Sequence, residues 1–223
     1  MAELIIGIDD AGRGPIIGPM VLAGVLIEKE NEAELKEWGA KDSKKLTPEK
    51  REEIAKKIKE KFRFYFELTT PEEIDSRTGV GTNLNRIEAI KSANIINHFT
   101  KNLKEKVKVI IDCPSTNIEA WQNYLQQHIE NLDLVELSCE HKADANHISV
   151  SAASIIAKTT RDSEIEKLKK EIGIDFGSGY PSDPNTCNFL EKHSQDFEDK
   201  GIIRKSWDTW TNVQAKREQK KLF

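Results

Sequence analysis

Apolar and polar positions alternate with the period of a β-strand in some segments and with that of an α-helix in others. The segments that predict strands lie mainly in the first two thirds of the chain. Short apolar runs, and short runs that alternate with polar residues, are typical of β-strands. Such runs predict strands over residues 4–8, 20–27, 62–68, 107–112 and 134–140. The segment between the first two runs is rich in glycine and proline, which predicts a turn and a hairpin-like connection.

Longer segments with helical spacing follow these runs. Thr47 and Pro48 have the form of an N-cap and a first helical residue, which predicts a helix to about residue 61. Further helices are expected from Asn83 or Asn85 to about residue 104, over 117–131, and from about 148 to 171. Strands joined by helical crossovers predict an α/β fold with a five-stranded mixed sheet flanked by helices. The C-terminal third predicts helices only, as an appended subdomain.

Length and composition narrow the class of protein. The 223 residues suit one domain with a tail or small subdomain, and no apolar run is long enough to span a membrane. The N-terminus lacks the basic-then-apolar layout of a signal peptide. Cys113, Cys139 and Cys187 form no C-x-x-C pair, which argues against a disulfide framework and a thiolate zinc site. We therefore expect a cytoplasmic protein with no membrane partner that acts as a monomer.

The charge is unevenly distributed. The net charge is −4, so the whole chain is not a cationic nucleic-acid binder. From residue 200 onward, however, seven Lys or Arg residues stand against two acidic ones, a local charge of +5. A basic tail on an acidic body fits a polyanionic partner, and the alternative is a solvated helix.

Four aspartates follow predicted strands. Asp9 and Asp10 close the first strand, Asp112 closes the fourth, and Asp144 comes after the fifth. Ligands of α/β sheets gather at strand ends, and two carboxylates about 4 Å apart repel by roughly 4 kcal/mol at an effective dielectric near 20. Hard divalent ions such as Mg²⁺ or Mn²⁺ would offset that repulsion, and two of them can clamp a phosphoryl group. Alternatively, each aspartate is a turn former or a helix cap.

Other motifs suggest contacts with phosphate, sugar or base. "GRGPIIG" matches neither a dinucleotide fingerprint nor a P-loop, but closely spaced glycines let the backbone and Arg13 approach a ligand. "KDSKKL" at 41–46 is a candidate phosphate-binding site at the start of a helix. Tyr180 in "GSGYPSDP" can stack on a sugar or base. Each motif also has a structural alternative. The glycine segment could be a tight turn, residues 41–46 a solvated turn, and Tyr180 an aromatic side chain that packs its own loop.

Together these motifs closely resemble the type 2 ribonuclease H family, in particular its archaeal branch. The matching segments appear in the order of the family between residues 5 and 184. They are "GIDDAGRGPIIGPMV", "KDSKKLT", "IDCPSTN", "EHKADANHISVSAASIIAKTTRD" and "GSGYPSDP".

The resemblance implies a ribonuclease H-like catalytic domain over 1–172 and a C-terminal helical substrate-binding part over 173–223. It implies an endonuclease that hydrolyses the RNA strand of RNA–DNA hybrids. It also implies cleavage 5′ of ribonucleotides embedded in duplex DNA, by a two-metal mechanism that leaves 3′-hydroxyl and 5′-phosphate ends. Mg²⁺ or Mn²⁺, two per site, would be the cofactors.

The resemblance also assigns roles to residues. The carboxylates that bind the metals map onto Asp9, Asp10, Asp112 and Asp144. The element that reads the ribose 2′-hydroxyl maps onto Gly12, Arg13 and Gly14, and the tyrosine that senses the substrate onto Tyr180. Ser43, Lys44 and Lys142 would hold phosphates.

The chain departs from the family pattern in three places. Asp10 stands where the family usually has glutamate, so its carboxylate is retracted by roughly one C–C bond, about 1.5 Å. Misplacement of that size can cost about 10²-fold in rate. Residues 146–149 replace a common tyrosine-proline pair, for which we expect a local loop change. Gln219 and Leu222 match only the first half of the sliding-clamp peptide with which archaeal relatives often end, so a clamp partner is a weaker hypothesis.

Two other functions remain open from the sequence. One is a different metal nuclease of the same fold, such as a junction resolvase. The other is a module that binds RNA–DNA hybrids without cutting them, with a metal site weakened at Asp10.

Overall fold

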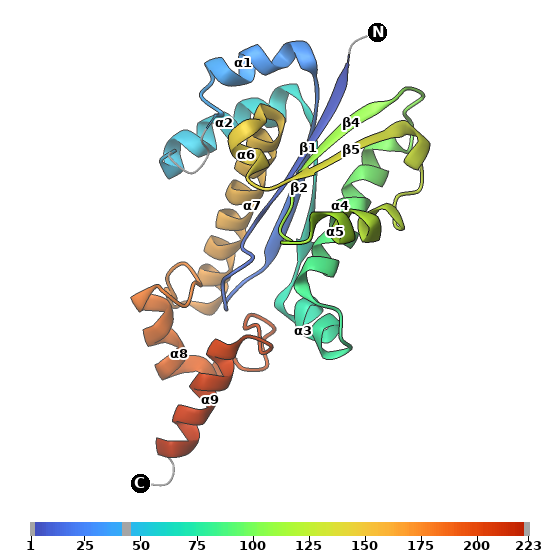
Figure 1. Ribbon diagram of the computed structural model, residues 1–223. Helices are drawn as coiled ribbons and strands as arrows, with labels where there is room; N and C mark the ends of the chain where they lie inside the picture. Colours follow the sequence, from blue (N-terminus) through green and yellow to red (C-terminus); the bar gives the residue numbers. More distant parts are fainter. Residues whose placement is uncertain (1–2, 42–45, 221–223) are drawn as a thin grey trace. The chain divides into compact units, whose positions relative to one another are not determined.

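The structure, a computed structural model, describes residues 3–41 and 46–220, and a five-stranded mixed sheet runs through it (Figure 1). Its strands are β1 (Leu4–Ala11), β2 (Met20–Glu28), β3 (Arg63–Thr69), β4 (Val107–Asp112) and β5 (Val135–Glu140). They lie in the order β3-β2-β1-β4-β5. β1 pairs antiparallel with β2 and parallel with β4, and β4 pairs parallel with β5. The predicted fold class is confirmed, and β1 continues three residues further than expected.

The helices lie between and after the strands. They are α1 (Glu32–Glu37), α2 (Pro48–Lys61), α3 (Pro71–Gly79), α4 (Leu84–Thr100), α5 (Ile118–Gln126), α6 (Ala143–Asn146), α7 (Ile148–Ile172), α8 (Pro184–Phe197) and α9 (Asp208–Lys220), with short 3₁₀ turns η1 (Lys29–Asn31) and η3 (Leu132–Leu134). α2 begins as predicted, because the Thr47 hydroxyl accepts a hydrogen bond from the Lys50 N–H at 3.3 Å.

Two helices differ from the prediction. α3 was not expected, although the Thr70 hydroxyl accepts the Glu73 N–H in the same way that Thr47 caps α2. α5 ends at Gln126 rather than near residue 131. The Asn97 side chain explains the early end, because it binds the His128 carbonyl and the Glu130 N–H at 2.9 Å each and holds that segment outside a helix.

The chain divides into two compact units. The first, here called the sheet unit, comprises residues up to 11, 21–67 and 85–160. The second, the helical unit, comprises residues 12–20, 68–84 and those from 161 onward. The turn between β1 and β2 therefore belongs to the helical unit. The functional division between residues 172 and 173 stays a prediction.

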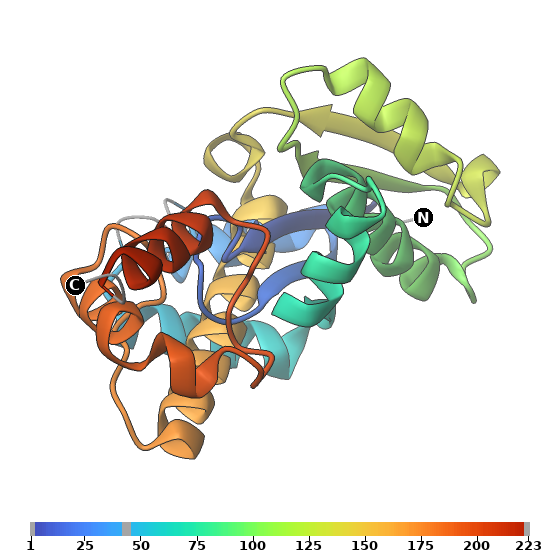
Figure 2. The same cartoon turned by 90° about the horizontal axis from the view of Figure 1, so that it is seen from below.

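Helices cover both faces of the sheet (Figures 1 and 2). A Cβ on Gly7 of β1 would lie 2.2 Å from the backbone of Ser149, so the first turn of α7 packs directly on that strand. On the other face, a Cβ on Gly24 of β2 would lie 2.4 Å from the Ile95 side chain of α4. These two close approaches fix which side chains of β1 face α7 and which face α4.

The helical unit has its own apolar core. Ile16, Ile17, Phe176, Phe189 and Trp210 are almost fully buried in it. Within the ranges 3–41 and 46–220, no helix is long and apolar enough to cross a bilayer.

Candidate active site

Two of the predicted acids lie side by side at the ends of parallel strands. β1 and β4 pair in register as far as Ile8 and Ile111, so Asp9 and Asp112 follow on the same face of the sheet. Asp9 is only 6% exposed. Burial raises the pKa of the Asp9 carboxyl well above its usual value, and the neighbouring charges of Asp10 and Asp112 raise it further. Hydrogen bonds from the Ser154 side chain and the Asp10 N–H, the latter at 2.8 Å, partly counter the rise.

Asp112 also fixes the start of α6. Its Oδ1 accepts the backbone N–H of Ala143 at 3.0 Å, and the next residue is the buried Asp144. Lys142, just before, is exposed and has a left-handed backbone with φ +58°, which a lysine adopts only at some cost. This turn brings the chain from β5 back to the end of β4.

Asp10 lies on the opposite face of β1 from Asp9. It pairs with Leu22 of β2, and strand alternation directs its side chain toward α4. There it lines a small cavity with Glu88 and Ser92 of α4, and Asp9 and Asp112 border the same cavity at the strand ends. Glu88 is 1% exposed, and no motif in the sequence marks it as a candidate site residue.

Asp144 lines a different hollow. That hollow also includes Lys36, Lys41 and His147. Among the described residues, no three His, Cys, Asp or Glu side chains are grouped closely enough to hold a metal ion as they stand. The structure thus places Asp9, Asp10 and Asp112 around one cavity and Asp144 in another. The hydrogen bond from the Ala143 N–H to Asp112 links the residue before Asp144 to the first cavity.

The donor set nevertheless fits a hard divalent cation. All four aspartates offer carboxylate oxygens, which Mg²⁺ and Mn²⁺ prefer. Burial first, and the charges of Asp10 and Asp112 after it, raise the pKa of Asp9, and a bound cation would favour the ionised carboxylate. His141 binds elsewhere, with its Nε2 2.7 Å from the Ser115 carbonyl oxygen.

A hydrogen-bonded pair of side chains connects β5 to the residue between α6 and α7. His147, which separates α6 from α7, pairs its Nε2 with a Glu140 carboxylate oxygen at 2.9 Å. This hydrogen bond is the largest cause that holds the pKa of Glu140 below its usual value. The pair ties the end of β5 to the start of α7 within the segment where the chain departs from the family pattern.

In the helical unit, a buried arginine holds the glycine loop. Arg204 is completely buried, and its guanidinium donates to the carbonyl oxygens of Gly12, Arg13 and Gly18 at 2.6 to 3.1 Å. Gly12 and Gly18 both have φ above +80°, a backbone region that favours glycine. Sequence reasoning counted Arg204 with the basic tail, because charge alone does not distinguish a buried arginine from a solvated one.

The loop with Tyr180 lies against the same glycine loop. The Ile16 and Ile17 N–H groups donate to the Gly179 carbonyl oxygen at 2.9 and 3.2 Å. The Tyr180 ring is 38% exposed, and a Cβ on Gly14 would lie 3.6 Å from its edge. Gly14 and Tyr180, which the sequence predicts to contact the substrate, are therefore neighbours.

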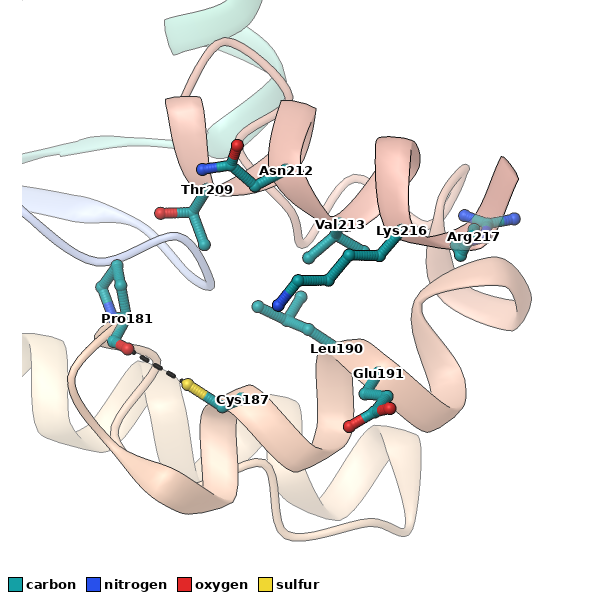
Figure 3. A pocket seen from close by; sticks show the side chains of 9 residues that line it. All are labelled: Pro181, Cys187, Leu190, Glu191, Thr209, Asn212, Val213, Lys216 and Arg217. Carbon is teal, nitrogen blue, oxygen red and sulfur yellow. Dashed lines mark hydrogen bonds between the residues drawn. The ribbon is translucent and has the colours of Figure 1, made fainter. Parts of the chain in front are cut away.

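The remaining predicted contacts are more scattered. Arg13 is half-buried and Lys142 is exposed, while Ser43 and Lys44 lie outside the described residues. A larger hollow of about 410 Å³ lies between α8 and α9, with Cys187, Leu190 and Val213 among its lining and Lys216 and Arg217 at one side (Figure 3). Among the described residues that line it, Glu191 alone carries a carboxylate, so this hollow does not resemble the acid-lined cavity.

The strand order, the parallel β1–β4 pair and the acids at the strand ends define a nuclease of the ribonuclease H-like class. A family model described as "Ribonuclease HII" matches residues 6–210. The chain belongs to the ribonuclease HII family, the type 2 ribonucleases H, which are metal-dependent endoribonucleases that act on RNA–DNA hybrids.

Relatives and solved structures agree with this assignment. Ribonuclease HII of Methanococcus maripaludis strain C6 is 45% identical, over 99% of this chain and 91% of its own length. That of Methanosarcina barkeri is 42% identical, over 94% and 95%. The crystal structure of ribonuclease H2 from Pyrococcus horikoshii superposes with a TM-score of 0.83 at 39% identity, covering 96% of this chain and 98% of that one.

The contacts of Arg204 predict a specific loss of stability. Arg204→Met would remove the guanidinium hydrogen bonds to the Gly12, Arg13 and Gly18 carbonyl oxygens, which should lower the free energy of unfolding by about 3 kcal/mol. Lys205→Met is the matched control, because the Lys205 ammonium pairs only with the well-exposed Asp199 carboxylate among the described residues. Urea unfolding of both variants checks this, and an Arg204→Met protein as stable as the parent would contradict it.

Proposed function

We propose that this chain both hydrolyses the RNA strand of RNA–DNA hybrids and cuts 5′ of single ribonucleotides in duplex DNA, leaving 3′-hydroxyl and 5′-phosphate ends. The observation that supports it most is the parallel register of β1 and β4, with buried Asp9 next to Asp112. Such crowding of charge is costly in a strand end unless it serves a cation. The family assignment supports the hybrid as substrate.

Asp9, Asp10, Asp112 and Asp144 are the residues that would hold two Mg²⁺ or Mn²⁺ ions. When bound, such ions lower the pKa of an attacking water and stabilise the leaving 3′-oxygen. The protein contributes carboxylates that are held in place by backbone hydrogen bonds. The bond from Ala143 N–H fixes one Asp112 oxygen, and that from Asp10 N–H fixes one Asp9 oxygen.

The helical unit would recognise the ribose. RNA differs from DNA at a sugar only by the 2′-hydroxyl, so polar groups and a surface at sugar distance are required. The backbone of Gly12 and Gly14 and the side chain of Arg13 would supply the polar groups. Tyr180, exposed beside Gly14, would pack against the nucleotide.

Cations on both units would hold phosphates. Lys142 is exposed and next to the acids in the chain, and Ser43 and Lys44 are proposed to do the same. In the basic tail, Lys216 is exposed, whereas Arg217 is half-buried and pairs with Glu198 at 3.2 Å. Affinity for the hybrid should therefore fall as salt rises.

The function is tested with a DNA duplex that contains one ribonucleotide. We expect cleavage 5′ of the ribonucleotide with Mg²⁺ or Mn²⁺ and none with a chelator. Asp144→Ala should bind an RNA–DNA hybrid normally but cleave it at least about 10²-fold more slowly, because the carboxylate is needed for catalysis rather than for phosphate contacts.

Asp133→Ala, which changes an exposed acid of the same unit, is the control and should cleave normally. Near-normal turnover by Asp144→Ala would contradict the assigned role. Preference for four-way DNA over the hybrid would favour a resolvase instead, and metal-independent binding without cleavage would favour a binding module.

Asp10→Glu tests the shorter side chain. Since Asp10 leaves β1 on the α4 side, its carboxylate must reach around the strand end to meet a cation near Asp9. The added methylene should raise the affinity for Mn²⁺, measured by isothermal titration, and raise turnover at limiting metal. Unchanged metal affinity and turnover would show that the length of this side chain does not matter.

A sliding clamp is a proposed partner. A solved structure titled as a complex of PCNA and RNase HII from Archaeoglobus fulgidus superposes with a TM-score of 0.80 at 36% identity, covering 92% of this chain and 95% of that one. Here Gln219 is exposed near the end of α9, and Leu222 lies outside the described residues. Deleting residues 219–223 should abolish binding to a purified archaeal clamp in surface plasmon resonance, whereas Gln214→Ala should not. Full binding after the deletion would exclude this peptide.

A further inference from the structure

One side chain in the helical unit touches both of the loops proposed to recognise the ribose. Arg161 of α7 is 6% exposed. Its Nη2 donates to the Ser178 carbonyl oxygen at 2.9 Å, two residues before Tyr180. Its guanidinium carbon lies 5.2 Å from the centroid of the Tyr180 ring, within the range of a cation–π contact.

The same side chain fills the space beside Gly12. A Cβ on Gly12 would lie 2.4 Å from both Cδ and Nε of Arg161, closer than real atoms approach. Gly12 must therefore be glycine for two reasons, its φ of +82° and the arginine packed against it. Gly14, two residues on, lies against the Tyr180 ring. Arg161 thus contacts the first glycine of the loop and the ring that rests on the second.

Burying the charged Arg161 side chain beside Gly12 costs free energy. Desolvation lowers the pKa of its guanidinium, which the Tyr180 and Asp162 side chains only partly oppose. Its Nε, moreover, is buried with no hydrogen-bond partner among the described residues. An apolar side chain would fill the volume at lower cost. What an arginine adds is a rigid planar group that can bond a carbonyl and stack on a ring at the same time.

We propose that Arg161 is a positioning residue that fixes the distance between the Tyr180 ring and the Gly12–Gly14 backbone, and that it thereby sets the preference for a ribonucleotide. This inference rests on the proposed function, because it assumes that these loops read the sugar. Arg161 acts through Tyr180 and the glycine loop and does not itself touch the substrate.

The proposal follows from the small chemical difference between ribose and deoxyribose. A ribonucleotide differs from a deoxyribonucleotide by a single hydroxyl. An enzyme can therefore distinguish them only if the Tyr180 ring and the Gly12–Gly14 backbone stay at a fixed distance from each other. Without Arg161, the ring of Tyr180 would keep its contact with Gly14 but lose the group on which it stacks. Misplacement of about 1 Å at a reacting centre can cost about 10²-fold in rate.

Arg161→Lys and Arg161→Gln test this, each alone and combined with Tyr180→Ala. For each protein, kcat and KM are measured on a DNA duplex with one ribonucleotide and on a continuous RNA–DNA hybrid. We expect kcat/KM to fall at least about 10-fold on the single ribonucleotide, mostly in kcat, and clearly less on the hybrid, where several ribonucleotides can be presented. The double variants should be no worse than Tyr180→Ala, because both changes remove the same arrangement.

Arg217→Lys is the matched control. It alters a half-buried arginine of the same unit that pairs with Glu198, on α9 and away in sequence from the Gly12–Gly14 and Tyr180 loops. Its effect should be similar on both substrates and additive with Tyr180→Ala. Equal losses on the two substrates for the Arg161 variants, or additive losses in the double variants, would overturn the proposal and leave Arg161 a structural residue.

The outcomes also separate this inference from the proposed function. If the parent protein cuts the hybrid but not the single-ribonucleotide duplex, the proposed function fails in its finer part and this inference fails with it. If the parent cuts both and the Arg161 variants keep its preference, only the inference fails. Should both Arg161 variants not fold, Arg161→Met, which keeps most of the side-chain length but removes the guanidinium, must give the selective loss; an unselective loss would contradict the proposal.

Discussion

The parallel pairing of β1 with β4 is the constraint on which the acid-lined cavity depends. It places two aspartates at the same level of the sheet, where each is close to the charge of the other. Burial and the neighbouring carboxylates both disfavour the ionised form of Asp9, so the arrangement costs free energy. The strand ladder, the packing of α7 on Gly7 and the hydrogen bond from Ala143 to Asp112 hold this arrangement against that cost.

The helical unit solves a different physical problem. Its glycine loop and the loop with Tyr180 contain little regular structure, and loops without partners leave carbonyl groups unsatisfied. Arg204 satisfies three of those carbonyl groups from one guanidinium, and the Gly179 carbonyl accepts the N–H groups of Ile16 and Ile17. The carbonyl groups of these loops are therefore satisfied by one buried side chain and by backbone donors of a neighbouring loop, rather than within strands or helices.

The sequence predicts the strands well because each is a compact apolar run between turn residues. It could not predict the end of α5, which depends on Asn97, a residue of α4 that is distant in sequence. The burial of Arg204 and Arg161 is likewise a tertiary effect, since nothing local marks an arginine that binds loop carbonyls. The opposite faces of Asp9 and Asp10 follow from the period of a strand, but the sequence predicts that the first strand ends at residue 8, before these two aspartates.

The acidic pair and the glycine loop are adjacent in the chain. Asp10 ends the acidic pair and Gly12 begins the glycine loop, with Ala11 between them. Two residues of extended chain span at most about 7 Å between the Cα atoms of Asp10 and Gly12. A substitution that shifts Gly12 therefore acts on the backbone of Asp10 as well, and the shorter carboxylate at position 10 leaves less reach to absorb such a shift. Asp10 is consequently the residue through which the backbone of the acid-lined cavity continues into the glycine loop.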